Sequence, residues 1–276
     1  MVGPTGTIYN ADSRLLGEFV RPSIHLTVTS PPYWGIKDYG VDNQIGYGQD
    51  YSDYIESLLD ILFQCAHLTI PGGRICVNIG EQYLSTKKYG RHRVAPTPQS
   101  IVEAMHSEYG VGDIDYMGSI IWHKISNQNA SGGGKWMGST YWPTDIALAF
   151  EHEYVLIFRK HGKRDKPSKE VAEKSKLTIE ERGEWCRAMW RIAPKRQKEH
   201  PAAFPIELPI RLIKMFSYYG DTVLDPFLGS GTTMSAALSL GRNCIGIELS
   251  GEYANLSMNR VGGRMFSPPV ELITLV

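Results

Sequence analysis

The sequence predicts an α/β fold with a doubly wound, mostly parallel sheet. Three observations support this: strand-like runs recur along the 276 residues, most of them are continuously apolar or β-branched, and helical patterns lie between several of them. Continuous apolar runs are typical of strands buried on both faces, and strands that alternate with helices are typical of parallel sheets. With 42% hydrophobic residues, the chain can bury a single core of this kind.

The strands are expected in seven short runs of apolar and β-branched residues: Thr7 to Asn10, His25 to Val28, Arg74 to Ile79, Ser119 to Trp122, Glu153 to Phe158, Thr222 to Leu224 and Asn243 to Glu248. Residues 52–67 carry an apolar stripe with helical spacing, and Pro71-Gly72-Gly73 is expected to end that helix and lead into the next strand. Further helices are expected at Gln99 to His106, Leu208 to Phe216, Thr233 to Leu240 and Glu252 to Val261.

Charge, cysteine content and hydropathy argue against a zinc protein, a secreted protein and a membrane protein. The formal net charge is zero, and the four cysteines form neither a CxxC pair nor a Cys/His cluster with zinc spacing. No amino-terminal signal peptide is recognisable, and no apolar run is long enough to span a bilayer. We therefore expect a cytoplasmic protein with reduced cysteines, no metal and no membrane span.

Two stretches interrupt the strand–helix pattern. Residues 158–198 carry 14 Lys/Arg against 6 Asp/Glu, a local net charge of +8, which indicates an anionic partner or a solvated helical surface. Within them, Thr178 to Glu181 spells a capping box, followed by Trp185, Ala188, Met189 and Ile192 on one expected helical face. Residues 127–144 combine Gly, Asn and Ser with two tryptophans and a tyrosine, which suits a ligand-contacting loop or an irregular structural one.

Two further stretches carry chemistry. The strand at His25 to Val28 ends in Thr29-Ser30-Pro31-Pro32-Tyr33-Trp34-Gly35, a rigid turn with a hydroxyl and two aromatics. The strand at Thr222 to Leu224 runs into the glycine-rich turn Asp225-Pro226-Phe227-Leu228-Gly229-Ser230-Gly231-Thr232-Thr233 before a helix. Such a turn lets a ligand approach the backbone, and Glu248, at the end of the following strand, is placed to bind ribose hydroxyls. No Lys follows the last glycine, so this is not a P-loop.

The glycine-rich turn and the SPPY turn together resemble the amino-group DNA methyltransferases that use S-adenosylmethionine. The order, with SPPY first and the glycine-rich turn last, resembles the β group, in which the fold is circularly permuted. Residues 200–213 are similar to the segment that lines the cofactor pocket, and residues 8–13 are similar to the strand whose acid lies near the adenine. The resemblance runs from about residue 7 to residue 261.

This resemblance implies one methyltransferase domain over residues 1–276, a seven-stranded sheet, and candidate DNA-recognition insertions at 127–144 and 159–198. It implies S-adenosylmethionine as cofactor, S-adenosylhomocysteine as product, and double-stranded DNA as partner. The catalytic residues would be Ser30, Pro31, Pro32 and Tyr33. The cofactor-binding residues would be Asp12, Thr29, His200, Pro201, Phe204, Asp225, Pro226, Phe227, Gly229, Ser230, Gly231, Thr232, Thr233 and Glu248. In the permuted order, the strands that precede Asp225 and Ser30 are neighbours in the sheet.

The SPPY turn suits methylation of an exocyclic amine. Such an amine is a poor nucleophile because its lone pair is delocalised into the ring, and acceptors around its N–H groups favour a localised lone pair. The Ser30 hydroxyl and the Pro31 carbonyl offer two acceptors, and the prolines hold the carbonyl rigidly. Tyr33 offers a face on which a base can stack, worth ~1–3 kcal/mol. A base in a duplex would have to be flipped to reach this turn.

Several alternatives stay open at this point. Ser in the first position of the tetrapeptide is associated in the family with N4 of cytosine, and Asp with N6 of adenine, so cytosine is favoured over adenine. A related tetrapeptide methylates glutamine amides, which leaves an RNA or protein methyltransferase as a second class, and a cofactor-binding module without catalysis as a third. The sequence decides neither whether a cognate restriction endonuclease exists nor whether the protein is a monomer or a homodimer.

Overall fold

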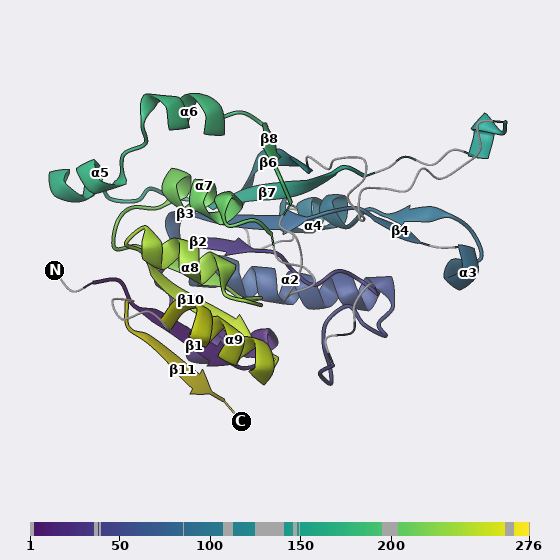
Figure 1. Cartoon of the computed structure of the whole chain (residues 1–276), viewed down its shortest axis with the longest axis horizontal. Helices are drawn as coiled ribbons and strands as arrows, with labels where there is room; N and C mark the ends of the chain where they lie inside the picture. Colours follow the sequence, from purple (N-terminus) through teal and green to yellow (C-terminus); the bar gives the residue numbers. More distant parts are fainter. Residues whose placement is uncertain are drawn as a thin grey trace.

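The structure is a computed structural model, and it describes residues 3–35, 38, 40–84, 86–106, 113–124, 141–145, 148, 150–194, 204–262 and 268–275. A twisted sheet crosses the molecule, and helices cover both of its faces (Figure 1). None of the helices in the described part of the chain has both the length and the apolar character needed to cross a membrane.

Six strands run parallel to one another: β1 (Gly6–Asn10), β2 (Ile24–Thr29), β3 (Thr69–Ile79), β9 (Thr222–Asp225), β10 (Asn243–Glu248) and β11 (Val270–Thr274). Three more complete the sheet: β6 (Ile114–Lys124), β7 (His152–Lys160) and β8 (Met189–Ile192). β7 is antiparallel to β3 and β6, whereas β8 is parallel to β6. The strand order is β11-β1-β10-β9-β2-β3-β7-β6-β8, and β4 (Gln82–Leu84) and β5 (Arg93–Ala95) pair separately as a hairpin.

The helices divide between two apolar cores. One core lies under α1 (Leu16–Phe19), α2 (Tyr51–Leu68) and α4 (Thr97–His106), and the other under α7 (Glu207–Phe216), α8 (Thr232–Ser239) and α9 (Gly251–Gly262). The apolar stripe predicted for residues 52–67 is buried, since Leu58, Ile61 and Leu62 have no exposed surface. Shorter helices lie in the connections: η1 (Ser13–Leu15), α3 (Thr86–Tyr89), η2 (Pro143–Asp145), α5 (Lys169–Ser175) and α6 (Ile179–Trp185).

The predicted fold class is confirmed, and each of the seven expected strands is present, but within the part of the chain that the structure describes the main sheet has nine strands instead of seven. The additional strands, β8 and β11, are the two edges of the sheet. Both are short, and each pairs with one neighbour only, so neither has the long apolar run that marks a central strand.

Two local predictions are wrong. Pro71-Gly72-Gly73 does not separate a helix from a strand: it lies inside β3, where the β2–β3 register shifts. A Cβ on Gly73 would lie 2.5 Å from Thr69 Cγ2, so glycine is needed there for close packing. The capping box of Thr178 and Glu181 is confirmed, but α6 ends at Trp185, and residues 189–192 form strand β8 instead of continuing the helix.

The permuted order has the predicted geometric consequence. β2 and β9, far apart in sequence, pair in parallel, with Leu26 opposite Val223 and Thr27 opposite Leu224. The carboxyl ends of β1, β2, β9 and β10 therefore meet at one edge of the sheet, which we call the carboxyl edge. In doubly wound sheets, ligands bind at this edge.

The described part of the basic segment 159–198 lies partly at the amino ends of the parallel strands and partly at their carboxyl ends. Antiparallel β7 ends at Lys160 beside the amino ends of the parallel strands, so α5 lies at the edge opposite the carboxyl edge (Figure 1). Parallel to β6, β8 returns the chain to the carboxyl edge, where Ile192 lies opposite Lys124.

Candidate active site

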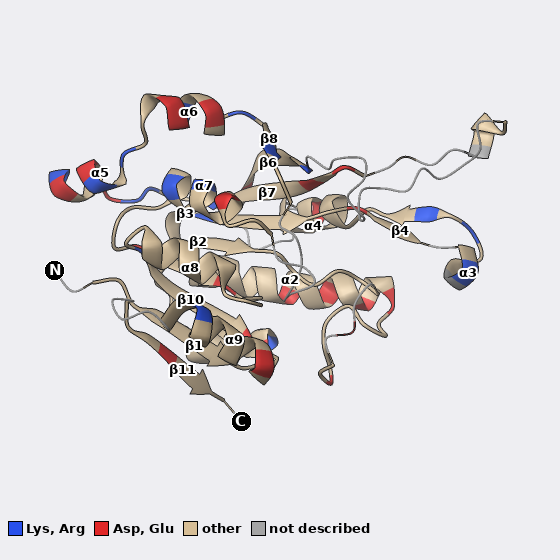
Figure 2. Ribbon diagram, in the orientation of Figure 1, with Lys and Arg blue, Asp and Glu red and all other residues tan. Residues whose placement is uncertain are grey.

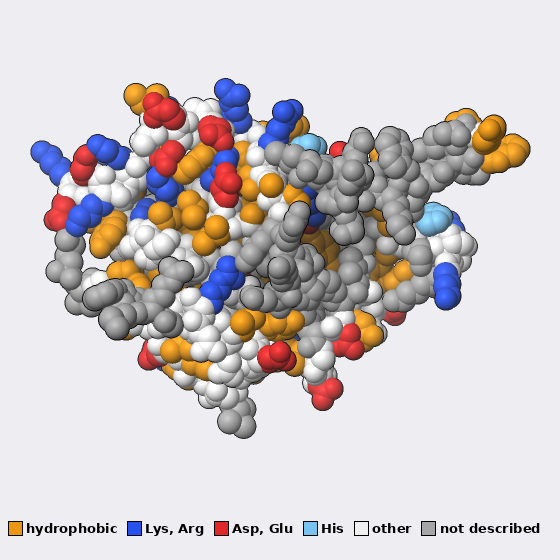
Figure 3. All heavy atoms as spheres, viewed as in Figure 1, with side chains coloured by type: hydrophobic (Ala, Val, Ile, Leu, Met, Phe, Trp, Pro, Cys, Tyr) orange, Lys and Arg blue, Asp and Glu red, His pale blue; other side chains and the backbone are white. Residues whose placement is uncertain are grey.

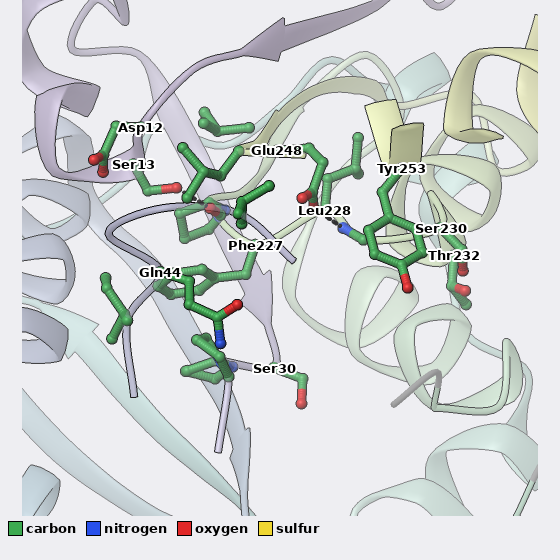
Figure 4. A pocket seen from close by; sticks show the side chains of 18 of the residues that line it. Asp12, Ser13, Ser30, Gln44, Phe227, Leu228, Ser230, Thr232, Glu248 and Tyr253 are labelled. Atoms are coloured by element: carbon green, nitrogen blue, oxygen red, sulfur yellow. Dashed lines mark hydrogen bonds between the residues drawn. The ribbon is translucent and has the colours of Figure 1, made fainter. Parts of the chain in front are cut away.

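A cavity opens at the carboxyl edge and holds about 920 Å³ of empty space, counting its open mouth. Most of its wall residues come from segments that are far apart in the sequence and that the fold brings together. These segments are Asp12 and Ser13 after β1, Ser30 to Pro32 after β2, the loop before α2, the glycine-rich turn after β9, and Glu248 with its neighbours at the end of β10. Phe204 before α7 and Tyr253 in α9 complete the lining. Figure 4 shows Asp12 and Ser13 on one side of the cavity, Ser230, Thr232 and Tyr253 on the other, and Ser30 at its lower end.

Glu248 is held in place by the backbone of the two loops beside it. Its Oε2 accepts the Gly229 N–H at 2.8 Å, and its Oε1 accepts the Ser250 N–H at 2.9 Å. Burial raises the pKa of this carboxyl, and the two N–H groups counteract that effect in part. Each carboxylate oxygen has a second lone pair, so Glu248 can still accept hydrogen bonds from hydroxyls in the cavity.

Asp225 lies beneath the cavity and does not line it. It is 1% exposed, and its Oδ1 accepts the Thr29 hydroxyl at 2.7 Å and the Phe227 N–H at 3.1 Å. Burial raises its pKa to about 6. Asp225 therefore ties the end of β2, which leads into Ser30, to the first residues of the glycine-rich turn.

The two glycines of the turn have different functions. Both adopt positive φ, 54° at Gly229 and 76° at Gly231, which favours glycine. Gly229 lines the cavity, whereas a Cβ on Gly231 would lie 3.1 Å from the Ser257 side chain. Gly231 thus serves the packing of α8 against α9, and Arg260 reinforces this contact by donating to the Ser230 carbonyl at 3.0 Å.

The structure brings most of the predicted site residues to one cavity. Those that line it are Asp12, Ser30, Pro31, Pro32, Phe204, Pro226, Phe227, Gly229, Ser230, Thr232 and Glu248. Thr29, Tyr33, Asp225, Gly231 and Thr233 lie next to it without lining it. His200 and Pro201 lie outside the described residues. The Asp12 carboxylate is also paired with Arg14, whose Nη2 lies 2.5 Å from Oδ2.

The SPPY turn is anchored from below by α2. Tyr54 Oη donates to the Pro32 carbonyl at 2.9 Å, and the Tyr33 side chain packs against the α2 core. A Cβ on Gly80 would lie 3.0 Å from Glu153 Cγ and 3.6 Å from Tyr33 Oη, so this glycine leaves room for both side chains.

A buried polar network beside Ser30 was not predicted from the sequence. Asn78, at 3% exposure, donates from Nδ2 to Glu153 Oε2 at 2.7 Å and lies 3.5 Å from Ser30 Oγ. Glu153 in turn forms an ion pair with Lys124. Asn78 Oδ1 is buried and has no hydrogen-bond partner among the described residues. The only signal in the sequence was the position of Asn78 and Glu153 as polar residues within apolar strands.

Other lining residues were also missed: Ser13, Val41, Asn43, Gln44, Ile45, Leu228, Ile247, Leu249 and Tyr253. Residues 41–45 belong to an irregular connection with no sequence pattern, and Tyr253 belongs to the expected helix after Glu248. Among the described residues, no group of three or more His, Cys, Asp or Glu side chains could hold a metal ion.

Comparisons with known proteins agree with this geometry. A family model described as DNA methylase, of the N6/N4 type, matches residues 24–259. Type II methyltransferase M.MthZI of Methanothermobacter thermautotrophicus is 34% identical, over 93% of this chain and 76% of that protein. Type II methyltransferase M.MjaI of Methanocaldococcus jannaschii is also 34% identical, over 91% of this chain and 89% of that protein.

Solved structures agree as well. A candidate DNA modification methylase from Thermus thermophilus, crystallised with S-adenosylmethionine, superposes with a TM-score of 0.74 at 33% identity, covering 97% of this chain and 99% of that chain. The cytosine-N4-specific PvuII DNA methyltransferase, at 24% identity and a TM-score of 0.68 over 94% of this chain and 87% of its own, shares the fold.

Proposed function

The chain belongs to the DNA methylase family of the N6/N4 type, and on that basis we propose that it methylates the exocyclic N4 amine of cytosine in duplex DNA. The resemblance seen in the sequence is confirmed: the protein is a DNA methyltransferase that uses S-adenosylmethionine. The observation that carries the proposal is that Ser30 opens onto the same cavity as Glu248 and the glycine-rich turn.

The cavity suits S-adenosylmethionine in its chemistry. Bound there, the cofactor supplies a methyl group on a sulfonium, which is already activated for transfer. The cavity offers apolar surface from Phe227, Ile247 and Leu249 for a flat base, and a carboxylate, Glu248, for ribose hydroxyls. Glu248 gives the cavity a negative charge, whereas the charge of Asp12 is neutralised by Arg14, and a carboxylate in the wall favours a cationic ligand.

Replacing Glu248 by alanine is expected to weaken S-adenosylmethionine binding more than tenfold, because hydrogen bonds to a charged group are worth roughly 1.5–3 kcal/mol. Titration calorimetry measures this affinity. The exposed Glu252→Ala, four residues further on, removes the same charge from the surface and is the matched control. Equal affinities for the Glu248 variant and the wild type would refute the ribose assignment.

Ser30 and Pro31 act on the target amine. We assign the Ser30 hydroxyl and the Pro31 carbonyl as acceptors for its N–H groups, so that the nitrogen lone pair points toward the methyl group. Both residues line the cavity, and the Tyr54 hydrogen bond to Pro32 keeps the turn from shifting. Fixed acceptors of this kind need no rearrangement as positive charge develops on the nitrogen. Alignment for direct transfer supplies much of the remaining rate.

The modified base is expected to be N4-methylcytosine, because Ser30 stands where family members that act on adenine more often carry Asp. The isotopically labelled cofactor is incubated with mixed-sequence DNA and, in parallel reactions, with RNA and with protein. Nucleoside mass spectrometry of the nucleic acids and detection of label in the protein identify the product. The Ser30→Ala enzyme serves as the blank. Labelled N6-methyladenine in place of N4-methylcytosine would overturn the choice of base but not the function of the turn, and label found only in RNA or protein would overturn DNA as the substrate.

We propose that only a part of each predicted recognition insertion, 127–144 and 159–198, contacts DNA. Tyr141 and Trp142, at the described end of the 127–144 loop, are 87% and 67% exposed and suit stacking on bases. In the segment 159–198, the α5 region lies at the edge away from the cavity, and Lys174 and Lys176 pair with Glu170 and Glu173. We therefore restrict the proposed contacts in that segment to residues from β8 onward; residues 195–198 lie outside the described residues.

The names of the relatives are those of type II methyltransferases. We accordingly propose a cognate restriction endonuclease that cuts the same site. Sequencing of the methylated positions, followed by digestion of methylated and unmethylated DNA with endonucleases specific for that sequence, tests whether the modification protects DNA.

A further inference from the structure

A strongly basic hairpin projects from the carboxyl edge. It comprises β4, α3 and β5 (residues 82–95) and follows directly after β3. It contains four Lys/Arg and no Asp/Glu, although the chain as a whole is neutral. Figure 2 shows the positive charge of α3 at the end of the molecule opposite α5, and Figure 3 shows these side chains at the surface beside a histidine. We call this element the basic hairpin.

The charges of the basic hairpin are not neutralised locally. Lys87, Arg91 and Arg93 are exposed, and none of them forms an ion pair with any described residue. Arg93 lies over the Tyr89 ring at 5.9 Å. Around α5, by contrast, Lys174, Lys176 and Arg164 each have an acidic partner. Lys87, Arg91 and Arg93 therefore keep their positive charges for an external partner.

The basic hairpin is joined to the catalytic turn through Trp34. Trp34 follows Tyr33 of the SPPY turn, is 6% exposed, and packs against Tyr89 of the hairpin with ring centroids 5.5 Å apart. Gln82 donates from Nε2 to the Trp34 carbonyl. Trp34 Nε1 donates to the Gln49 carbonyl at 2.8 Å, which fixes the indole from the other side. The hairpin is thus positioned relative to Ser30 by contacts with the residues that follow it.

A second contact joins the hairpin to the chain that leads into β7. Tyr83 stacks on Phe150 with centroids 4.7 Å apart and donates to the Leu148 carbonyl. Tyr141 and Trp142 directly precede η2, and η2 and α3 project from the same end of the molecule (Figure 1). A basic element and exposed aromatics therefore lie at the same end of the molecule as the carboxyl edge.

From these contacts we infer that the basic hairpin binds the phosphate backbone of the DNA next to the flipped target base. The inference rests on the proposed function, because it takes duplex DNA as the substrate. Lys and Arg side chains that neutralise phosphates release condensed counterions, which supplies affinity without sequence preference. Because the hairpin packs on Trp34, its contact with DNA also holds the phosphate backbone at a defined distance from Ser30. The flipped base can then enter the cavity in the correct position.

The test compares two triple variants that remove equal charge. One is Lys87→Gln, Arg91→Gln and Arg93→Gln in the basic hairpin; the other is Lys163→Gln, Lys166→Gln and Lys169→Gln, exposed residues next to α5. Binding to a short duplex of mixed sequence is measured by fluorescence anisotropy over a series of salt concentrations. The slope of log affinity against log salt changes by about 0.9 for each phosphate that the protein no longer neutralises, so the hairpin variant is expected to flatten it by about 2 to 3. The α5 variant is expected to keep the wild-type slope.

The outcomes separate this inference from the proposed function. Titration calorimetry with S-adenosylmethionine verifies that both variants keep the cofactor site, since no hairpin residue lines the cavity. A hairpin variant with the wild-type salt slope would overturn the inference while wild-type methylation of DNA still supported the function. Equal flattening in both triple variants would also overturn it, because overall charge would then explain the result. Wild-type enzyme that methylates no DNA would overturn the proposed function itself.

Discussion

Replacing Ser30 by alanine is expected to slow methyl transfer on the order of 100-fold while leaving cofactor and DNA affinity almost unchanged. The hydroxyl gains importance when the amine acquires positive charge, so its loss raises the barrier more than it weakens the ground-state complex. Ser30 lines the cavity, and the hydrogen bond that its hydroxyl accepts from Asn78 Nδ2 is long, at 3.5 Å, so truncation removes only a weak interaction among the described residues. Single-turnover rates measure the effect, with calorimetry for the cofactor and anisotropy for DNA.

Tyr33→Ala provides the contrast. The Tyr33 ring packs against the α2 core, so its removal should impair both capture of the base and turnover. The expected pattern is a Ser30 variant with normal affinities and slow chemistry, beside a Tyr33 variant defective in both. A Ser30→Ala enzyme that turns over at the wild-type rate would refute the assigned function of the hydroxyl.

Replacing Asp225 by asparagine is expected to stabilise the folded protein by up to about 3 kcal/mol at pH 8. Asp225 is 1% exposed and takes part in none of the ion pairs among the described residues, and burial raises its pKa from 3.8 to about 6. Above pH 6 the fold must therefore bury a carboxylate whose hydrogen bonds offset the loss of hydration only in part. Asparagine keeps an oxygen that can accept from Thr29 and Phe227 but carries no charge.

The pH dependence has a definite sign. The pKa of Asp225 is higher in the folded than in the unfolded chain, so this residue binds its proton more tightly when the protein is folded. Its contribution to the free energy of unfolding is therefore most favourable below about pH 4 and is lost as the pH rises through 6. The difference in free energy of unfolding between variant and wild type, from urea titrations, should therefore grow from pH 4 to pH 7 and then level off. A difference that does not vary with pH would contradict this prediction.

Asp221→Asn is a control with the opposite sign. Asp221 precedes β9, at the other end of the same strand, and is buried, as Asp225 is, with 4% of its surface exposed. Unlike Asp225, it forms a bidentate ion pair with Arg164. Removing its charge leaves the guanidinium without its partner, so this variant should lose stability at pH 8. If both substitutions stabilise the protein, the loss of a negative charge in general, and not the burial of Asp225 in particular, would explain the result.

The sequence was sufficient for the parts of the site that are local in the chain. The glycine-rich turn, the SPPY turn and Glu248 each follow a recognisable strand, and strands of this kind end at a common edge. The Asn78–Glu153–Lys124 network was not accessible in this way. It depends on the register in which β3 pairs with β7 and β7 with β6, and that register is set by packing across the whole sheet.

Charge counts along the chain were an incomplete guide to the DNA-binding surface. The net charge of +8 in residues 158–198 was the strongest such signal, yet the structure pairs Arg164, Lys174 and Lys176 with acids and places α5 away from the cavity. The four basic residues of the hairpin gave a weaker count but lie at the carboxyl edge. Only the path of the chain distinguishes these two positions.

The position of β1 has a consequence for synthesis and folding. β1 lies between β10 and β11, and Asn10 donates to the Glu248 carbonyl across 238 residues of sequence. A nascent chain leaves the ribosome amino end first, so β1 emerges long before β10 and β11, the strands with which it pairs. The half of the sheet that binds the cofactor therefore forms last, with the large loop-closure entropy that slows folding of high-contact-order topologies. Until then, β1 exposes unpaired backbone N–H and C=O groups that can pair with another chain and cause aggregation. A chaperone that binds this strand would prevent such pairing.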